Sequence, residues 1–489
     1  IIKTSKLTTI GEYAFYQCTN LTLNLPASVQ TIGECALYAV PTINVADYDQ
    51  WSFLVLNEDL FRTKWGHVYY NNELITHYTF PDDVLEIPEC RFYGCTDIVS
   101  VTIPQNVIKI GKAAFRDCIN LLSADIKGPV KLIDEQAFYN CKLLENIVFP
   151  NSLETIGSSA FCLCDALTNV TFGNGLKEIG QSAFYGCKSL QKVDIGDITN
   201  WCNVVFSGTS SRGINDGNPL SISKKVYLNG LELTELTIPT GVEKIGDFVF
   251  NNCTSLTKLT ITDGAGAIGN YAFSNCTGLT SIELPSSVHS LGDGAFYGCT
   301  GITAFNLPEG LTEIAPYLFY GCTNLATVTT HSGITSIGDY AFNECTNLAG
   351  FVIPEEVETI KRYAFKSCHS LTSINMPNSV TTVGIGAFND CTGLTAVHIK
   401  DLAAWCNIKY VYQYNQGAGT GMAWEPQYMA SNPLKMAHYL YLNNEKITEL
   451  TIPKGVKDIT PVSGLVYLYI PVYLLNPTQA FNFLFLFPG

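Results

Sequence analysis

The sequence predicts a repeat solenoid, a stack of similar β-rich coils, and two observations lead to this fold class. Hydrophobic residues make up 47% of the 489 residues and charged residues only 15%, enough for a continuous core. The phenylalanine of an Ala-Phe-x-x-Cys segment recurs every 23 residues in two runs, at Phe92, Phe115, Phe138, Phe161 and Phe184, and at Phe250, Phe273, Phe296, Phe319, Phe342, Phe365 and Phe388. Stacked repeats bury their apolar faces on their neighbours, so we expect one array rather than several globular domains.

The unit Leu279–Gly301 shows the pattern of one coil, which begins with a short strand. Leu279, Ile282 and Leu284 supply the apolar residues, and Pro285 ends the segment. Because Ile282 and Leu284 alternate with polar residues, one face of this strand is expected to point into the core. The polar residues between them are left to face solvent.

A second apolar pair, Val288 and Leu291, predicts another short extended segment. A turn slot follows, filled by Asp134, Ala315 or Lys361 in three coils. Glycine fills it in the others, at Gly11, Gly33, Gly111, Gly157, Gly180, Gly246, Gly269, Gly292, Gly338 and Gly384. We expect a positive φ to be favoured in this slot without being required.

The Ala-Phe-x-x-Cys segment closes the coil. Ala295, Phe296 and Cys299 have the spacing that places side chains on one side of a single helical turn. Each coil is therefore predicted to contain a strand, a bend, a second short extended segment and one helical turn.

Thirteen of the eighteen cysteines lie three residues after the repeated phenylalanine slot. They are Cys18, Cys95, Cys118, Cys141, Cys164, Cys187, Cys253, Cys276, Cys299, Cys322, Cys345, Cys368 and Cys391. Parallel neighbours about 4.8 Å apart do not readily offer disulfide geometry. We interpret these residues as buried thiols that form a core ladder, with disulfides and a metal site as the alternatives.

The chain is predicted to divide into repeat blocks and spacers. The repeats span residues 1–40, 81–196 and 236–400, and the spacers span 41–80, 197–235 and 401–449. Residues 450–489 form a final partial repeat and an apolar tail. The first residues already match the second half of a coil, so we expect the chain to be an N-terminally truncated fragment.

The spacers resemble one another. Asp197 precedes Trp201 in one and Asp401 precedes Trp405 in another, each followed by Cys and Asn, while Asp47 and Trp51 form a degenerate copy. An aspartate four residues before a tryptophan predicts an aspartate-capped helical turn whose tryptophan covers the neighbouring coil. Ligand binding by that tryptophan is the alternative.

The residues after Asp458 are apolar, but Pro471 and Pro477 interrupt them. A membrane helix needs about 20 uninterrupted apolar residues. We therefore expect no transmembrane helix, and interpret the tail as a hydrophobic end coil or as a sequence artefact, with membrane association as the alternative.

The unit Leu-x-x-Ile-x-Leu-Pro-x-x-Val-x-x-Ile-Gly-x-x-Ala-Phe-x-x-Cys resembles the BspA-like, or Treponema pallidum type, leucine-rich repeat. The resemblance covers about three-quarters of the chain. It implies a right-handed leucine-rich-repeat solenoid with a parallel sheet along one face. It also implies a cell-surface or extracellular protein, and some members of the family are adhesins for host matrix and plasma proteins.

The sequence predicts no catalytic, cofactor or metal site. The seven histidines fall at different places in the repeat and show no ligand spacing. The net charge of −15 argues against a nucleic-acid partner, which would require a basic stripe. We therefore expect a protein that is not an enzyme and needs no cofactor.

Two surfaces are candidates for partner binding. Between the core positions of the strands the candidates are Lys258, Glu283, Asn306, Thr329, Asn375 and His398. Tyrosines two before and one after the phenylalanine share one face of the predicted turn, and the candidates are Tyr271, Tyr297, Tyr320 and Tyr340. The alternatives are a merely solvated sheet face and a ridge that only packs on neighbouring coils.

We predict a non-enzymatic, adhesin-like protein that offers an extended surface to a protein or glycan, host matrix and plasma proteins included. It is expected to be monomeric. Two alternatives are an intracellular interaction scaffold and the non-catalytic arm of a larger glycan-degrading enzyme. The complete reading frame would decide among them.

Overall fold

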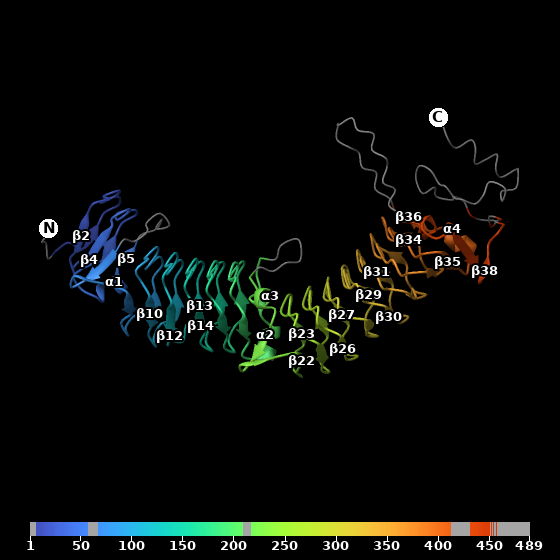
Figure 1. Cartoon of the computed structure of the whole chain (residues 1–489), viewed down its shortest axis with the longest axis horizontal. Coiled ribbons are helices and arrows are strands. Elements are labelled where there is room, and N and C mark those ends of the chain that lie inside the picture. Colours follow the sequence, from blue (N-terminus) through green and yellow to red (C-terminus); the bar gives the residue numbers. More distant parts are fainter. Residues whose placement is uncertain are drawn as a thin grey trace, which may run out of the picture. The chain divides into compact units, whose positions relative to one another are not determined.

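The structure, a computed structural model, describes residues 6–56, 67–208, 217–411 and 431–449, together with Thr451, Pro453 and Val456. The apolar tail after Asp458 lies outside the described residues. The chain divides into two compact units, residues 1–256 (unit 1) and residues 257–489 (unit 2). Within each unit the chain winds into stacked coils (Figure 1), which confirms the predicted solenoid.

In unit 1 the first strand of each coil joins a parallel sheet. The sheet orders are β2-β4-β6-β7 and β8-β10-β12-β14-β16-β18-β20-β21. Equivalent slots of neighbouring coils pair, as Ser100 does with Ser123. The bounds are β2 (Thr22–Leu25), β4 (Thr42–Val45), β6 (His67–Tyr70), β7 (Glu73–Leu74), β8 (His77–Thr79), β10 (Ser100–Ile103), β12 (Ser123–Ile126), β14 (Asn146–Val148), β16 (Asn169–Thr171), β18 (Lys192–Asp194), β20 (Tyr227–Leu228), β21 (Leu231–Glu232) and, beginning the next block, β22 (Glu235–Ile238).

The second strand of each coil is only two residues long and builds separate sheets, β1-β3-β5 and β9-β11-β13-β15-β17-β19. The bounds are β1 (Thr9–Ile10), β3 (Thr31–Ile32), β5 (Val55–Leu56), β9 (Glu86–Ile87), β11 (Lys109–Ile110), β13 (Leu132–Ile133), β15 (Thr155–Ile156), β17 (Glu178–Ile179), β19 (Val205–Phe206) and β23 (Lys244–Ile245). The helices of unit 1 are α1 (Gln50–Phe53), α2 (Ile198–Cys202) and α3 (Leu220–Ser223).

Unit 2 has the same coil. Its first strands are β24 (Lys258–Ile261), β26 (Ser281–Glu283), β28 (Ala304–Asn306), β30 (Thr327–Thr329), β33 (Ser373–Met376), β35 (Ala396–Ile399), β37 (Tyr439–Leu442) and β38 (Glu445–Lys446). Its second strands are β25 (Ala267–Ile268), β27 (Ser290–Leu291), β29 (Glu313–Ile314), β31 (Ser336–Ile337), β32 (Thr359–Ile360), β34 (Thr382–Val383) and β36 (Lys409–Tyr410). Helix α4 (Leu402–Cys406) and the 3₁₀ helix η2 (Pro433–Lys435) lie in the last spacer.

The third side of the coil differs from the predicted helical turn. In Gly111–Cys118 each turn closes by a hydrogen bond from an N–H to the carbonyl three residues before, and Ala113 and Asp117 have positive φ values of 52° and 60°. The N–H groups of Ala113, Phe115 and Asp117 donate to carbonyl oxygens of the next coil at 2.7–2.9 Å. Two left-handed residues prevent a helix, because they turn alternate N–H groups toward the neighbouring coil.

The expected positive φ at the glycine turn slot is wrong. None of the described glycines in that slot is among the positive-φ residues. In several coils glycine permits a close approach instead, since a Cβ on Gly157, Gly180 or Gly292 would lie 2.5 Å from a backbone nitrogen of the preceding coil. A side chain in this slot forces that neighbour to move.

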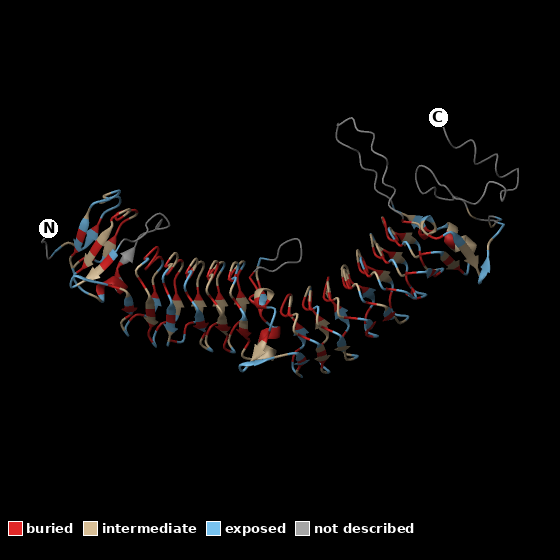
Figure 2. Cartoon of the chain, viewed as in Figure 1, coloured by how far each residue is buried: buried red, intermediate tan, exposed pale blue. Residues whose placement is uncertain are grey.

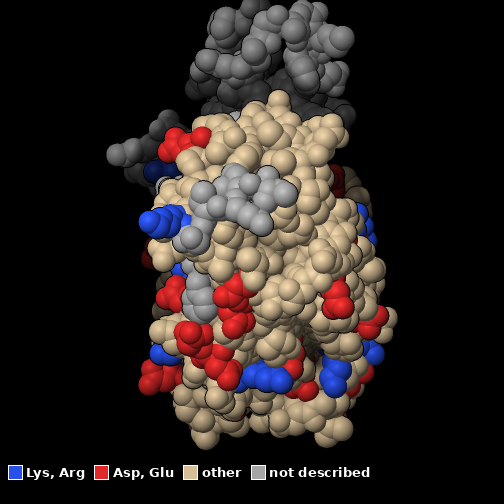
Figure 3. Space-filling view, turned by 90° about the vertical axis from the view of Figure 1, so that its left-hand side faces the viewer, with Lys and Arg blue, Asp and Glu red and all other residues tan. Residues whose placement is uncertain are grey.

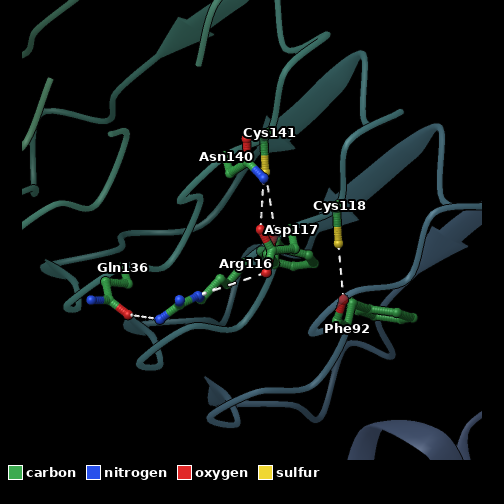
Figure 4. A network of polar contacts seen from close by, with 8 residues as sticks. Phe92, Arg116, Asp117, Cys118, Gln136, Asn140 and Cys141 are labelled. Carbon is green, nitrogen blue, oxygen red and sulfur yellow. Dashed lines mark hydrogen bonds and ion pairs between the residues drawn. The ribbon is translucent and has the colours of Figure 1, made fainter. Parts of the chain in front are cut away.

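The core is a stack of phenylalanines lined by cysteines. Neighbouring rings from Phe92 to Phe184 are stacked with centroids 5.0–5.7 Å apart, and the repeated phenylalanines are fully buried. Figure 2 shows that buried positions recur from coil to coil along each unit. The ladder cysteines are buried except Cys18, which is partly exposed. Figure 4 shows the Sγ–H of Cys118 donating to the carbonyl of Phe92 at 2.9 Å. The predicted buried ladder is therefore confirmed.

The predicted helical turn is present in all three spacers, and its aspartate cap is confirmed in two of them. Asp197 caps α2 by accepting the Asn200 N–H at 2.7 Å, and Asp401 caps α4 in the same way. Helix α1 begins at Gln50 without a side-chain cap, because Asp47 instead accepts the N–H of Asp49.

The spacer tryptophans cover the core and do not serve as a ligand surface. Trp51 and Trp201 are fully buried, and Trp405 is 9% exposed. The indole N–H of Trp201 donates to the carbonyl of Val249 in the next coil at 2.7 Å. The alternative that these tryptophans bind a ligand is therefore wrong.

Each spacer also contains a β-hairpin that was not predicted. The turns Asn71-Asn72, Asn229-Gly230 and Asn443-Asn444 have positive φ at both residues, as a type I′ turn requires. Each hairpin adds one antiparallel strand of two residues to the end of a parallel sheet. The Asn-Gly and Asn-Asn pairs in the sequence are typical of such hairpin turns and could have predicted them.

The division of the chain into seven segments, four of repeats and three of spacers, stays a prediction.

Candidate binding surfaces

All ten candidate binding residues lie in unit 2, and the structure brings the six on the sheet face together in pairs. Lys258 on β24 and Glu283 on β26 form a salt bridge of 2.8 Å, and Thr260 donates to the same carboxylate at 3.3 Å. The hydrogen bond from Lys258 lowers the pKa of Glu283 below its ordinary value. A charged partner would therefore have to displace an existing pair.

The other two pairs are polar. Asn306 on β28 lies opposite Thr329 on β30, and both side chains are exposed. Asn375 on β33 lies opposite His398 on β35, whose ring stacks on Tyr441 with centroids 4.7 Å apart. Candidate residues on neighbouring strands therefore lie side by side.

These pairs do not form one uninterrupted row. The strands that carry them belong to three sheets, which contain β24-β26, β28-β30 and β33-β35-β37-β38. Between the last two sheets, the described residues contribute only the isolated bridges Thr327–Gly350 and Val352–Asn375. A ligand lying along this side would meet three short polar patches.

The predicted tyrosines form one continuous cluster, here called the tyrosine ridge. Two further tyrosines in the same slots complete it, so that it consists of Tyr271, Tyr297, Tyr317, Tyr320, Tyr340 and Tyr363. Centroids of stacked neighbours lie 4.7–5.0 Å apart in the pairs Tyr297–Tyr320, Tyr317–Tyr340 and Tyr340–Tyr363. Tyr271 reaches Tyr297 at 6.1 Å. Ring packing along the coils is therefore confirmed.

Four ridge tyrosines have a left-handed backbone. The φ angles are 51° at Tyr271, 56° at Tyr317, 57° at Tyr340 and 55° at Tyr363. Bulky residues rarely adopt this region, which costs of order 1–3 kcal/mol each. Glycine occupies the same slot at Gly294, where a Cβ would lie 2.4 Å from the Tyr271 ring.

Partial burial raises the pKa of five ridge phenols, those of Tyr271, Tyr297, Tyr317, Tyr320 and Tyr363. Partial burial, and then the nearby Glu344 carboxylate, raises the pKa of Tyr320 to about 12. The Tyr320 hydroxyl donates to Glu344 at 3.1 Å. The hydroxyls of Tyr297, Tyr317 and Tyr340 make no hydrogen bond to any described residue. The ridge therefore presents hydroxyl donors at neutral pH.

Charged groups flank the ridge. The guanidinium of Arg362 lies 5.3 Å from the ring centroid of Tyr340 and 3.4 Å from Asp339. The ammonium of Lys366 lies 5.8 Å from the ring centroid of Tyr363. No repeat rule predicted these cation–π contacts, because the charged residues occupy variable slots.

Unit 1 contains a groove that was not predicted. The strands β12 and β14 pair only at Ser123 and Asn146, whereas β10 and β12 pair over four residues. A groove of about 300 Å³ opens there, lined by Ala124, Asp125, Ile126, Asn146, Ile147, Val148, Phe149 and Pro150. Ala124 takes a core slot that larger residues fill elsewhere, which was the signal in the sequence.

The described residues offer no catalytic or metal constellation. His77 Nδ1 and Ser100 Oγ lie 2.6 Å apart on β8 and β10, but this exposed pair has no described acidic residue on the histidine. The described chain holds no group of three potential metal ligands. Among the residues that the structure describes, we find no helix with the length and hydropathy of a membrane span. Figure 3 shows acidic and basic side chains interspersed on one face.

Stacked 23-residue coils with a phenylalanine and cysteine core define a leucine-rich-repeat solenoid. The family model described as the BspA type leucine rich repeat region matches residues 1–72, 63–191, 131–215, 220–349 and 312–414. The chain belongs to this family.

Solved structures with a similar fold come from several bacteria. A leucine-rich repeat protein from Bacteroides ovatus is 26% identical, with a TM-score of 0.48, over 69% of this chain and 92% of that one. A leucine rich cell surface protein from Faecalibacterium prausnitzii is 21% identical, with a TM-score of 0.39, over 85% and 96%. The T. pallidum leucine rich repeat protein is 24% identical, with a TM-score of 0.27, over 46% and 78%. A comparison with curated proteins found no match.

Proposed function

We propose that this chain is a non-enzymatic, adhesin-like surface protein that binds a protein partner through the tyrosine ridge. The observation that carries the proposal is the ridge itself, six neighbouring tyrosines on one side of unit 2. Tyrosine supplies a large contact area at low conformational-entropy cost and is enriched where binding energy concentrates. The polar pairs on the sheet face lack such anchors.

The packing of the ridge favours a protein over a glycan. Sugar rings stack on open aromatic faces, but most ridge rings cover one another, as Tyr297 and Tyr320 do at 4.7 Å and 6°. The ring edges and hydroxyls are then left for a partner. These groups suit polypeptide side chains and main-chain carbonyls.

The proposed location at the cell surface or outside the cell rests on membership of the BspA type family. Antibody against unit 2 should label intact cells of the source organism. Labelling only after the cells are permeabilised would favour the intracellular scaffold instead.

The binding proposal is tested with immobilised matrix proteins, plasma proteins and glycans. The double variant Tyr320→Ala and Tyr340→Ala should lose at least about tenfold in affinity for the protein that the wild type binds. Tyr185 occupies the same repeat slot as Tyr320 but lies in unit 1 and is 55% exposed, so Tyr185→Ala is the matched control. Equal binding by both variants, or binding of glycans alone, would contradict the proposal.

A further inference from the structure

The stacked pairs of the tyrosine ridge have a regular spacing along the coils. Tyr317 to Tyr340 is 5.0 Å and Tyr340 to Tyr363 is 4.9 Å, so two steps span about 10 Å. A polyproline II helix has three residues per turn and a rise of about 3.1 Å, and therefore repeats every 9.3 Å or so. Every third residue of such a segment would therefore contact every second tyrosine of the stack, for example Tyr317 and Tyr363.

We propose that the partner segment of the tyrosine ridge is a proline-rich polypeptide in the polyproline II conformation. This inference rests on the proposed function of the ridge and specifies the chemistry of its partner. An α-helix has a pitch near 5.4 Å, which is also close to the distance between two stacked tyrosines, so the spacing alone does not distinguish the two kinds of ligand. Hydrogen bonding distinguishes them.

Hydrogen-bond complementarity favours the polyproline II segment. The hydroxyls of Tyr297, Tyr317 and Tyr340 are without described hydrogen-bond partners. A polyproline II backbone has no internal hydrogen bonds, so its carbonyls need external donors, and proline offers no N–H to compete for acceptors. An α-helix consumes its own carbonyls and gains less from a row of donors.

The shape and stiffness of the ligand also fit the ridge. The tyrosine rings pack face to face, so their edges line the surface, and the apolar CH₂ groups of proline can pack against these edges. A polyproline II segment is already extended before it binds, so it loses little conformational entropy on a rigid stack. Aromatic surfaces that bind proline-rich segments use the same advantage.

The charge near the ridge indicates which residue accompanies proline. Glu344 is exposed beside Tyr320, whereas Asp339 is already paired with Arg362. A basic residue in the ligand can reach Glu344 by replacing the single hydrogen bond from Tyr320. We therefore assign a segment with arginine or lysine between prolines.

The test uses the purified chain and a synthetic peptide of four Pro-Pro-Arg repeats, with binding measured by calorimetry. Two peptides serve as controls, one with alanine in place of every proline and one with glutamine in place of every arginine. Each control should bind at least about tenfold more weakly than Pro-Pro-Arg. Equal binding of the alanine peptide would overturn the proposal.

Substitutions of the ridge tyrosines then test whether the peptide binds at the tyrosine ridge. Tyr340→Phe keeps the ring and removes one donor, and should weaken binding severalfold. The double variant Tyr320→Ala and Tyr340→Ala should abolish binding, and Tyr185→Ala should leave it unchanged. Unfolding curves of all variants show whether the fold persists. Loss of binding in Tyr185→Ala, or none in the ridge variants, would overturn the inference.

The two proposals fail separately. If the ridge variants lose the protein partner found on the array, yet the Pro-Pro-Arg peptide does not bind, the ridge function stands and the polyproline inference is wrong. If the peptide binds the ridge and no array protein needs the ridge, the polyproline inference stands and the adhesin-like function is contradicted.

Discussion

Most ladder cysteines fill core volume and also donate a hydrogen bond to a carbonyl group of the preceding coil. The carbonyl of Phe273 accepts the N–H of Cys276 in its own coil at 3.3 Å and the Sγ–H of Cys299 in the next coil at 3.1 Å. The same thiol bond recurs along both units, with distances of 2.9–3.2 Å. A purely apolar side chain would leave this second bond unmade.

The thiols should be inaccessible in the folded protein. Burial raises the pKa of Cys299 to about 12 and that of Cys391 to about 12, which keeps both as unreactive thiols at neutral pH. We expect a thiol reagent to label only Cys18 and Cys406 at once, since these two are partly exposed. Unfolding without reductant should expose most ladder thiols, and recovery of mainly oxidised cysteines would contradict the core-ladder interpretation.

The phenylalanine stack should dominate the stability of a coil. Phe296 is fully buried and lies 5.8 Å from Phe273 and 6.4 Å from Phe319. Phe296→Ala should lower the free energy of unfolding by about 3–5 kcal/mol, measured in urea. Phe296→Leu, which retains most of the volume, should cost less. A change within experimental error would mean that the ring is not a core residue.

At the scale of the element, the turn glycines test close approach against backbone conformation. A Cβ on Gly292 would lie 2.5 Å from the Asn270 nitrogen, whereas a Cβ on Gly11 would meet nothing within 4 Å. Gly292→Ala should therefore destabilise by about 1–3 kcal/mol, because backbone must shift.

Gly11→Ala is the matched control in the same repeat slot and should leave the midpoint of unfolding nearly unchanged. Neither glycine has a positive φ, so alanine is compatible with both backbones. Equal destabilisation by the two substitutions would show that backbone conformation, and not the neighbouring coil, requires glycine.

The Ala-Phe-x-x-Cys turn shows why local spacing misled the sequence-based prediction. The spacing of Ala295, Phe296 and Cys299 fits a helical turn, and all three side chains are indeed buried. The backbone, however, forms a run of short turns whose alternate N–H groups bond to the next coil. A bond to another coil has no signature in the residues of one coil.

At the scale of the whole molecule, the buried thiols should make stability strongly dependent on alkaline pH. Burial raises the pKa of many ladder thiols above the ordinary value of 9.0, as it does for Cys299 and Cys391, both to about 12. The unfolded chain therefore releases thiol protons first. The stabilisation is fully present below pH 9 or so and is lost as the pH rises toward the folded values.

Above that pH, the free energy of unfolding should fall by about 1.4 kcal/mol per pH unit for each thiol whose pKa is raised in the folded state. Unfolding free energies measured in reductant from about pH 8 to about pH 11 should fall steeply, with a slope that corresponds to several protons. Cys299→Ala should reduce that slope by about one proton. A flat profile above pH 9 would contradict burial of the ladder.

The repeat pattern of the sequence predicts the period, the core residues and the positions open to solvent. Identical coils that stack must repeat the residues they bury, so Phe296 and Cys299 could be assigned to the core from spacing alone. The same rule placed Tyr297 and Tyr320 on one side, because equivalent slots of stacked coils are neighbours.

The contacts between neighbouring coils could be seen only in the three-dimensional structure. It showed that glycine at Gly292 makes room for a neighbouring backbone, that six tyrosines form one ridge and that a groove lined by Ala124 opens beside β12 and β14. The physical reason is common to all three. Each depends on distances between residues of different coils, and a repeat period fixes which coils meet but not how closely their atoms approach.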